Sequence, residues 1–314
     1  MLQNPLVSVI VVSWNTRELL RRCLASVTAS RVPLEVLVVD NASTDGSPEM
    51  VRREFPRARL MANANNLGFG RANNQVLPSV LGTYVLLLNP DAELESGALE
   101  RLLAVLEQRP EVGVVGPLVV STDGSVQSTR RRFPTVSTTF VESTIIQPLL
   151  PSTHPLLRSY YVLDRADQEP QDVDWLVGAC LLVRKVAIDQ VGGFDPRFFM
   201  YFEETDWCRR FGQAGWSIVF EPSARVRHLG GQSSDQAPLR RVCEFNESKC
   251  RYVRKWHGLG PSLALRWFLF TTSAFQLAEE LLKMALGHKR SLRRARVSLW
   301  AGVLRWQAAR LIST

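Results

Sequence analysis

The chain has 314 residues, of which 46% are hydrophobic and 22% are charged, enough for one large α/β core with a modest appendage. In the C-terminal region the longest uncharged stretch is the 12-residue run 267–278, which is short of the ~20 residues that span a bilayer and so excludes a transmembrane helix there. The five cysteines show no metal-type spacing. Their odd number, in a chain without a signal peptide, indicates reduced thiols and a cytoplasmic protein.

Positive charge is concentrated near the C-terminus. Residues 240–314 contain 15 Lys or Arg and 4 acids, a net charge of +11, so the total of +8 leaves −3 for the first 239 residues. This asymmetry predicts two parts, an α/β domain over 1–239 and a basic helical region over 240–314.

The N-terminal segment predicts an α/β unit. The run 6–14 is rich in β-branched residues, as in strands buried on both faces of a parallel sheet, and Asn15 follows it as a cap for a helix over 16–27. A second strand over 34–39 ends at Asp40 and Asn41, which open a polar turn. Open α/β sheets bind ligands at the carboxyl ends of their strands, and no glycine-rich phosphate loop occurs here. We therefore expect side chains such as Asp40 or Asn41 to recognise a nucleotide.

Two further segments carry polar groups. The Asn- and Gly-rich stretch 63–75 predicts tight turns and contains Arg71, a cation able to pair with a phosphate. A strand over 84–88 runs into Asn89 and Asp91. One carboxylate beside a bound diphosphate is an adequate Mg²⁺ site, although a turn role for Asp91 stays open.

An acidic cluster follows the aromatic run FFMYF. Glu203, Glu204 and Asp206 stand at the predicted start of a helix. Apolar neighbours raise a carboxyl pKa toward the range of a general base. The alternative is that these acids only favour the helix dipole.

Taken together, these segments resemble the family-2 glycosyltransferases and their rhamnosyltransferase-like branch. The matching stretches, in chain order, are VSVIVVSWN, VDNASTDGS, NNLGFGRANN, LLLNPDAEL, WLVGACLLVRK and VGGFDPRFFMYFEETDWCRRFGQAGW, followed by His228. The resemblance implies an α/β fold of the GT-A type, a Rossmann-like mixed sheet flanked by helices. It also implies inverting transfer of a sugar from a nucleoside diphosphate to a hydroxyl, helped by Mg²⁺ or Mn²⁺.

The resemblance assigns roles by position. Asp40 and Asn41 match the turn that reads base and ribose, Arg71 lies near the diphosphate, Asp91 matches the metal site, and His228 matches a further metal or diphosphate contact. The remaining nucleotide-sugar positions are Asn15, Asn89, Gly178 and Ala179. The catalytic base is the second acid of the pair after the aromatic run, which is Glu204 here, with Glu203 and Asp206 as reserves. This chain has Glu-Glu where the family has Glu-Asp.

The segment 128–172 is predicted to be a long loop over the site. The basic region predicts helices over 262–286 and 290–312 that lie on an anionic membrane surface, as a peripheral protein on the inner face of the cell membrane. Packing on the catalytic domain or an oligomer interface is the alternative, and no nucleic-acid motif accompanies the charge. The leading function is transfer of rhamnose from dTDP-rhamnose to a glycolipid or polysaccharide. The alternative is a non-catalytic nucleotide-sugar or membrane-binding homologue.

Overall fold

The computed structural model describes residues 5–287 and 289–311, so the outermost residues of the predicted domains, and residue 288, lie outside it. The chain forms two compact units. The first contains the chain up to Phe133 together with Ser159–Ser233, and the second contains Pro134–Arg158 together with the chain from Ser234 onward. The predicted basic region 240–314 falls in the second unit.

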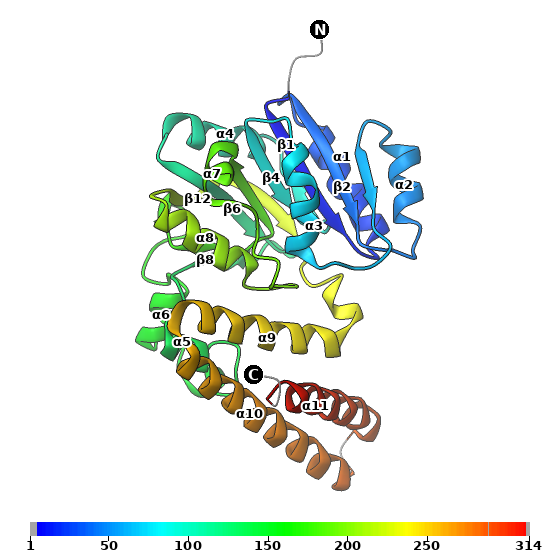
Figure 1. Cartoon of the computed structure of the whole chain (residues 1–314), viewed down its shortest axis with the longest axis vertical. Coiled ribbons are helices and arrows are strands. Elements are labelled where there is room, and N and C mark those ends of the chain that lie inside the picture. Colours follow the sequence, from blue (N-terminus) through cyan, green and yellow to red (C-terminus); the bar gives the residue numbers. More distant parts are fainter. Residues whose placement is uncertain (1–4, 288, 312–314) are drawn as a thin grey trace. The chain divides into compact units, whose positions relative to one another are not determined.

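The first unit is built on a mixed β-sheet (Figure 1). In spatial order its main strands are β3 (Arg59–Ala62), β2 (Leu34–Asp40), β1 (Val7–Ser13), β4 (Tyr84–Leu88), β11 (Cys180–Arg184), β6 (Val112–Val120), β12 (Ser217–His228) and β5 (Ala92–Leu94). Strands β3, β2, β1 and β4 are parallel, and β11 lies antiparallel between β4 and β6. Because β12 is parallel to β6, the ends of β1, β2, β4 and β12 and the start of β11 share one edge.

Two short strands extend the main sheet, and two others form a separate two-stranded sheet. Strand β7 (Val126–Gln127) pairs with β6, β9 (Gln171–Val173) pairs with β12, and β8 (Arg130–Arg131) pairs with β10 (Trp175–Leu176). The matching stretch WLVGACLLVRK, residues 175–185, therefore contains two strands, β10 and β11. Gly178 and Ala179 lie in the connection between them.

Helices cover both faces of the sheet. Successive side chains of β1 point to opposite faces, and because they are apolar on both, each face packs against helices. Val7, Val9 and Val11 pack in one core with helices α1 (Arg17–Thr28), α2 (Ser47–Glu54) and α4 (Ala98–Gln108). Ile10 and Val12 pack in the other with α3 (Phe69–Val76), α7 (Lys185–Val191) and α8 (Glu203–Gln213). The predicted α/β class, with a mixed sheet flanked by helices, is confirmed.

The second unit is helical. Its elements are α5 (Val136–Val141), the short 3-10 helices η2 (Gln147–Leu149) and η3 (Ser234–Gln236), α9 (Pro238–His257), α10 (Leu259–Ala285) and α11 (Arg290–Leu311). The prediction of a long loop over 128–172 is wrong, because this segment contains β8, α5, η2, α6 (Pro155–Tyr160) and β9. Helices α10 and α11 confirm the two predicted tail helices, whereas α9 was not among them.

Two charged residues of α10 pair with the neighbouring helices. Glu247 of α9 accepts hydrogen bonds from Arg266 at 2.9 and 3.0 Å, and Arg293 of α11 donates to the buried Glu280 at 2.8 Å. The exposed side of α10 carries large apolar side chains, with Trp267 57%, Phe275 60% and Leu282 62% exposed, together with the half-exposed ion pair of Glu279 and Lys283. Within residues 5–287 and 289–311, no helix is long and apolar enough to cross a membrane.

Candidate active site

The predicted site residues of the first unit gather at the edge where β1, β2, β4 and β12 end. Asn15 follows β1, Asp40 is the last residue of β2, Asn89 follows β4, and His228 is the last residue of β12. Gly178 and Ala179 join them because the antiparallel β11 begins where β4 ends.

The two carboxylate oxygens of Asp40 differ in their hydrogen bonding. Its Oδ2 accepts a hydrogen bond from the backbone N–H of Ser43 at 2.9 Å, whereas its buried Oδ1 has no partner among the residues that the structure describes. A buried acceptor without a donor is costly, so a ligand N–H or hydroxyl is a suitable partner. Asn15 shapes the same turn, since its Oδ1 accepts from the N–H of Thr44 at 2.8 Å.

Asn41 and Arg71 are held by the protein's own backbone and side chains. Asn41 Nδ2 donates to the carbonyl oxygen of Gly68 at 3.1 Å, and its Oδ1 accepts from Asn63 at 3.0 Å. Arg71, on α3, donates through Nε to the carbonyl of Pro196 at 2.7 Å while its side chain remains exposed. Both residues thus connect loops of the site.

The acid pair occupies the first turn of α8 after a strained approach. Tyr201 and Phe202, with φ of 68° and 63°, are both in the left-handed region, which non-glycine residues adopt at a cost. Glu203 is buried and Glu204 is half-buried. Burial and the neighbouring Glu204 raise the pKa of Glu203 well above its usual range. Burial also raises the pKa of Glu204, although backbone N–H groups, including that of Gly178, oppose this shift.

Within the described part of the chain, Oε2 of Glu203 and Oε2 of Glu204 each lack a hydrogen-bond partner. A Cβ at Gly178 would lie 3.7 Å from Glu204 Oε1, so glycine leaves the Glu204 carboxylate open on that side. Of the two acids, Glu204 is the less buried residue, and its unpartnered Oε2 is itself buried.

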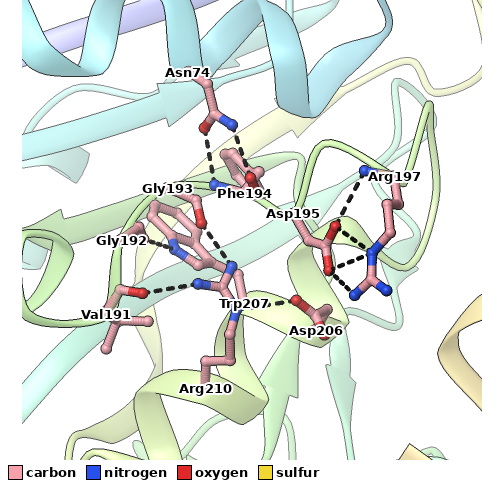
Figure 2. Close-up of polar contacts among 10 residues, drawn as sticks. All are labelled: Asn74, Val191, Gly192, Gly193, Phe194, Asp195, Arg197, Asp206, Trp207 and Arg210. Atoms are coloured by element: carbon pink, nitrogen blue, oxygen red, sulfur yellow. Dashed lines mark hydrogen bonds and ion pairs between the residues drawn. The ribbon is translucent and has the colours of Figure 1, made fainter. Parts of the chain in front are cut away.

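Asp206 belongs to a supporting network (Figure 2). Its fully buried carboxylate accepts a hydrogen bond from Arg210 Nε at 3.0 Å, and Arg210 donates further to the carbonyls of Val191 and Gly193 at 3.0 and 2.7 Å. Trp207 Nε1 donates to the carbonyl of Gly192 at 2.8 Å. These bonds hold the turn that leads into the aromatic run FFMYF, residues 198–202, which we call the aromatic loop. Asp206 is therefore placed to orient α8.

Asn74 holds the same turn from α3. Its Oδ1 accepts from the N–H of Phe194, and its Nδ2 donates to the carbonyl of Phe194, both at 2.8 Å (Figure 2). The sequence analysis did not identify Asn74. Its position in the Asn-rich stretch was the available signal, but nothing local indicated a partner 120 residues away.

Asp91 and His228 come together although 136 residues separate them. His228 Nε2 lies 3.2 Å from Asp91 Oδ1 and 3.3 Å from Asn89 Nδ2. Two donors bound to one octahedral ion at about 2.1 Å, on adjacent positions, lie about 3 Å apart, so the pair fits a divalent ion. Over the described residues, no group of three or more His, Cys, Asp and Glu is placed to hold a metal ion.

The acid pair and the Asp91–His228 pair are connected through one short segment. The carbonyl of Ala179 accepts from the N–H of Asn89 at 3.0 Å, and the adjacent Gly178 packs against Glu204. The connection between β10 and β11 therefore places a carboxylate of raised pKa beside a possible metal site. This arrangement suits a displacement that needs both a base and a stabilised anionic leaving group.

The chain is similar to known glycosyltransferases along most of its length. The profile of a family described as "Glycosyl transferase family 2" matches residues 8–192. The N-acetylglucosaminyl-diphospho-decaprenol L-rhamnosyltransferase of Mycobacterium tuberculosis is 33% identical over 300 residues, covering 92% of this chain and 94% of that protein.

Two solved structures share the fold. A mannosyltransferase from Pyrobaculum calidifontis in complex with GDP-Man and Mn²⁺ superposes with a TM-score of 0.55 at 19% identity, over 98% of this chain and 87% of its own. GalNAc-T7 with UDP, GalNAc and Mn²⁺ has a TM-score of 0.58 at 18% identity, over 94% of this chain and 55% of its own. They confirm the predicted GT-A fold.

Proposed function

The chain belongs to glycosyl transferase family 2, and from that premise we propose that it is an inverting rhamnosyltransferase whose donor is dTDP-rhamnose. The acceptor is a hydroxyl of a glycolipid or polysaccharide. The name of the Mycobacterium tuberculosis relative, which is similar to this chain along nearly its whole length, supports a rhamnosyl group and a lipid-linked acceptor, and the dTDP carrier is part of the proposal. The observation that carries the chemistry is the adjacency of Glu204 to the segment that also contacts Asn89.

Glu204 is the general base of the proposed reaction. It takes the proton of the acceptor hydroxyl while the acceptor oxygen bonds to the anomeric carbon, and the bond from that carbon to the diphosphate oxygen breaks. The nucleoside diphosphate leaves with the electron pair. A carboxyl whose pKa is raised by burial is better matched to this proton transfer near neutral pH than an exposed one.

Asp91 and His228 are the proposed ligands of the metal ion, Mg²⁺ or Mn²⁺. When bound, the ion would offset the charge that develops on the leaving diphosphate. Mn²⁺ is present in the two solved structures of similar fold, which supports a divalent ion here. Asp40, through its unpartnered Oδ1, is the proposed contact to the nucleoside, with Asn15, Asn41 and Asn89 shaping its pocket. Arg71 is proposed to pair with the diphosphate after exchanging its contact with Pro196.

We further propose peripheral binding at the cytoplasmic face of the membrane through the predicted C-terminal region, 240–314. The support is the outward apolar face of α10 together with the chain from residue 286 onward, which contains seven Lys or Arg and no acid. An apolar helix face flanked by cations suits an anionic lipid surface. A symmetric dimer through this face would bring like charges together, which opposes the oligomer alternative.

A transfer assay tests the proposal. The full chain is incubated with a synthetic N-acetylglucosaminyl-diphospho-polyprenol as acceptor. Parallel reactions contain dTDP-rhamnose, GDP-mannose or UDP-galactose as donor. We expect product from dTDP-rhamnose alone, with an anomeric configuration by NMR opposite to that of the donor. Product from another donor would replace the proposed sugar, and retention of configuration would exclude Glu204 as a base in a single displacement.

A further inference from the structure

Gln127, the last residue of β7, contacts His228 at two points. Its Nε2 donates to the backbone carbonyl of His228 at 2.8 Å and to Ser121 Oγ at 3.1 Å. Its Oε1 lies 2.9 Å from His228 Nδ1. The reverse amide orientation would place two acceptors, the Gln127 oxygen and the His228 carbonyl, 2.8 Å apart. The contacts therefore determine which end of the amide faces the ring.

This orientation selects one tautomer of His228. The amide oxygen only accepts hydrogen bonds, so Nδ1 must carry the hydrogen, and the lone pair of the neutral ring is then on Nε2. Nε2 is the atom that faces Asp91 Oδ1 at 3.2 Å. In this tautomer Nε2 and Asp91 Oδ1 are both acceptors, as two ligands of one metal ion are, and Asn89 Nδ2, 3.3 Å from Nε2, is placed to donate to the ring nitrogen.

We infer that Gln127 is a positioning residue that holds His228 as an Nε2 ligand beside Asp91. This inference rests on the proposed metal site. Hydrogen bonds to the second nitrogen of a ligating histidine orient the ring, and their loss typically weakens metal affinity 10–100-fold. Gln127 itself does not touch the metal or the substrate.

The test measures Mn²⁺ affinity of the full chain by EPR of free Mn²⁺, without nucleotide and with dTDP. We expect Gln127→Leu to weaken Mn²⁺ binding about 10–100-fold. Gln127→Glu keeps an acceptor for the hydrogen on Nδ1 of His228, so its Mn²⁺ affinity should fall less than that of Gln127→Leu. Gln108→Leu, an exposed glutamine at the end of α4, is the matched control and should bind as the wild type does.

A second readout separates positioning from general destabilisation. Two-bond ¹H–¹⁵N spectra of histidine-labelled protein report which ring nitrogen is protonated, with His228→Asn identifying the signal. We expect the Nδ1–H form in the wild type and a mixture in Gln127→Leu. An unchanged tautomer and Mn²⁺ affinity in Gln127→Leu would overturn the inference. Should that variant not fold, the same two measurements on Gln127→Glu and Ser121→Ala decide it.

Failure of the proposed metal site can be distinguished from failure of the proposed role of Gln127. If Asp91→Asn and His228→Asn bind Mn²⁺ as tightly as the wild type, the metal site itself is wrong. If they weaken binding and Gln127→Leu does not, the metal site stands and the role of Gln127 is wrong.

Discussion

Gly68 and Phe199 are in direct backbone contact: a Cβ at Gly68 would lie 2.1 Å from the carbonyl oxygen of Phe199. The same carbonyl accepts a hydrogen bond from the N–H of Phe69 at 2.9 Å. The start of α3 and the aromatic loop before the acid pair therefore form one packed unit, and a side chain at position 68 would separate them.

Gly68→Ala should consequently destabilise the protein and impair turnover. Gly192→Ala is a closely matched control, because Gly192 has the same φ of 84° but nothing within 4 Å of its added Cβ. Backbone strain alone should cost each variant about 1–3 kcal/mol, and the collision should cost Gly68→Ala about a further 1–3 kcal/mol. Urea unfolding of both variants measures the difference. Equal losses in the free energy of unfolding would show that the loop at Phe199 moves away from the added Cβ without an energetic cost.

Glu204→Gln should lower turnover by ~10²–10⁴-fold, the range of general base catalysis, and leave donor affinity within a few-fold. Glu203→Gln serves as the control, since it removes the neighbouring buried acid. Steady-state kinetics with calorimetric donor binding make the comparison. If Glu203→Gln or Asp206→Asn loses turnover and Glu204→Gln does not, the base is misassigned.

The buried Glu203 should make stability depend on pH. Its pKa in the folded state lies above the ordinary value of about 4.3, so the folded state binds the proton more tightly than the unfolded chain. Stability contributed by protonated Glu203 is present at low pH and is lost as pH rises through the folded-state pKa. The melting temperature of Glu203→Gln, relative to the wild type, should therefore increase as pH rises from 4. A difference that is constant or falls with pH would contradict the burial argument.

Asp91→Asn should weaken nucleotide binding in the presence of Mn²⁺ but change it little in a chelator, because the carboxylate acts through the ion. Fluorescence titration with dTDP under both conditions is the measurement. Equal losses with and without metal would mean that the Asp91 side chain has a structural role, for example through its contact with His228.

Trp267→Glu and Phe275→Glu should abolish flotation with anionic liposomes at low salt, because each places a charge on the outward face of α10. Leu81→Glu is the control, as Leu81 is 65% exposed and lies in the first unit. Wild-type binding should weaken at high salt. Flotation of both α10 variants as efficient as that of the wild type would exclude this face as the membrane contact.

Local patterns predicted much of the fold. The runs that became β1, β2 and β4 are continuous and apolar, and the polar residues at their ends lie at one edge because parallel strands require it. The split between β10 and β11 was not predicted, since the apolar run 175–185 has no break in pattern. The link between Gln127 and His228 joins residues 101 apart without any motif, so it emerges only from the folded sheet. The separate environments of Glu204 and Asp206 depend on which side of one helical turn each occupies.

The central position of β11 also affects the nascent chain. Strands β4 and β6 are made early, but β11, which pairs with both, is complete only at residue 184, about 60 residues after β6 ends. At about 5–20 residues per second, the edge of β6 that pairs with β11 stays unpaired for roughly 3–13 s during synthesis, and the corresponding edge of β4, which is made earlier, stays unpaired for longer. Unpaired edges of apolar strands recruit strands from other chains. Slow translation should therefore lower the yield of soluble protein, and chaperones that bind extended segments should restore it.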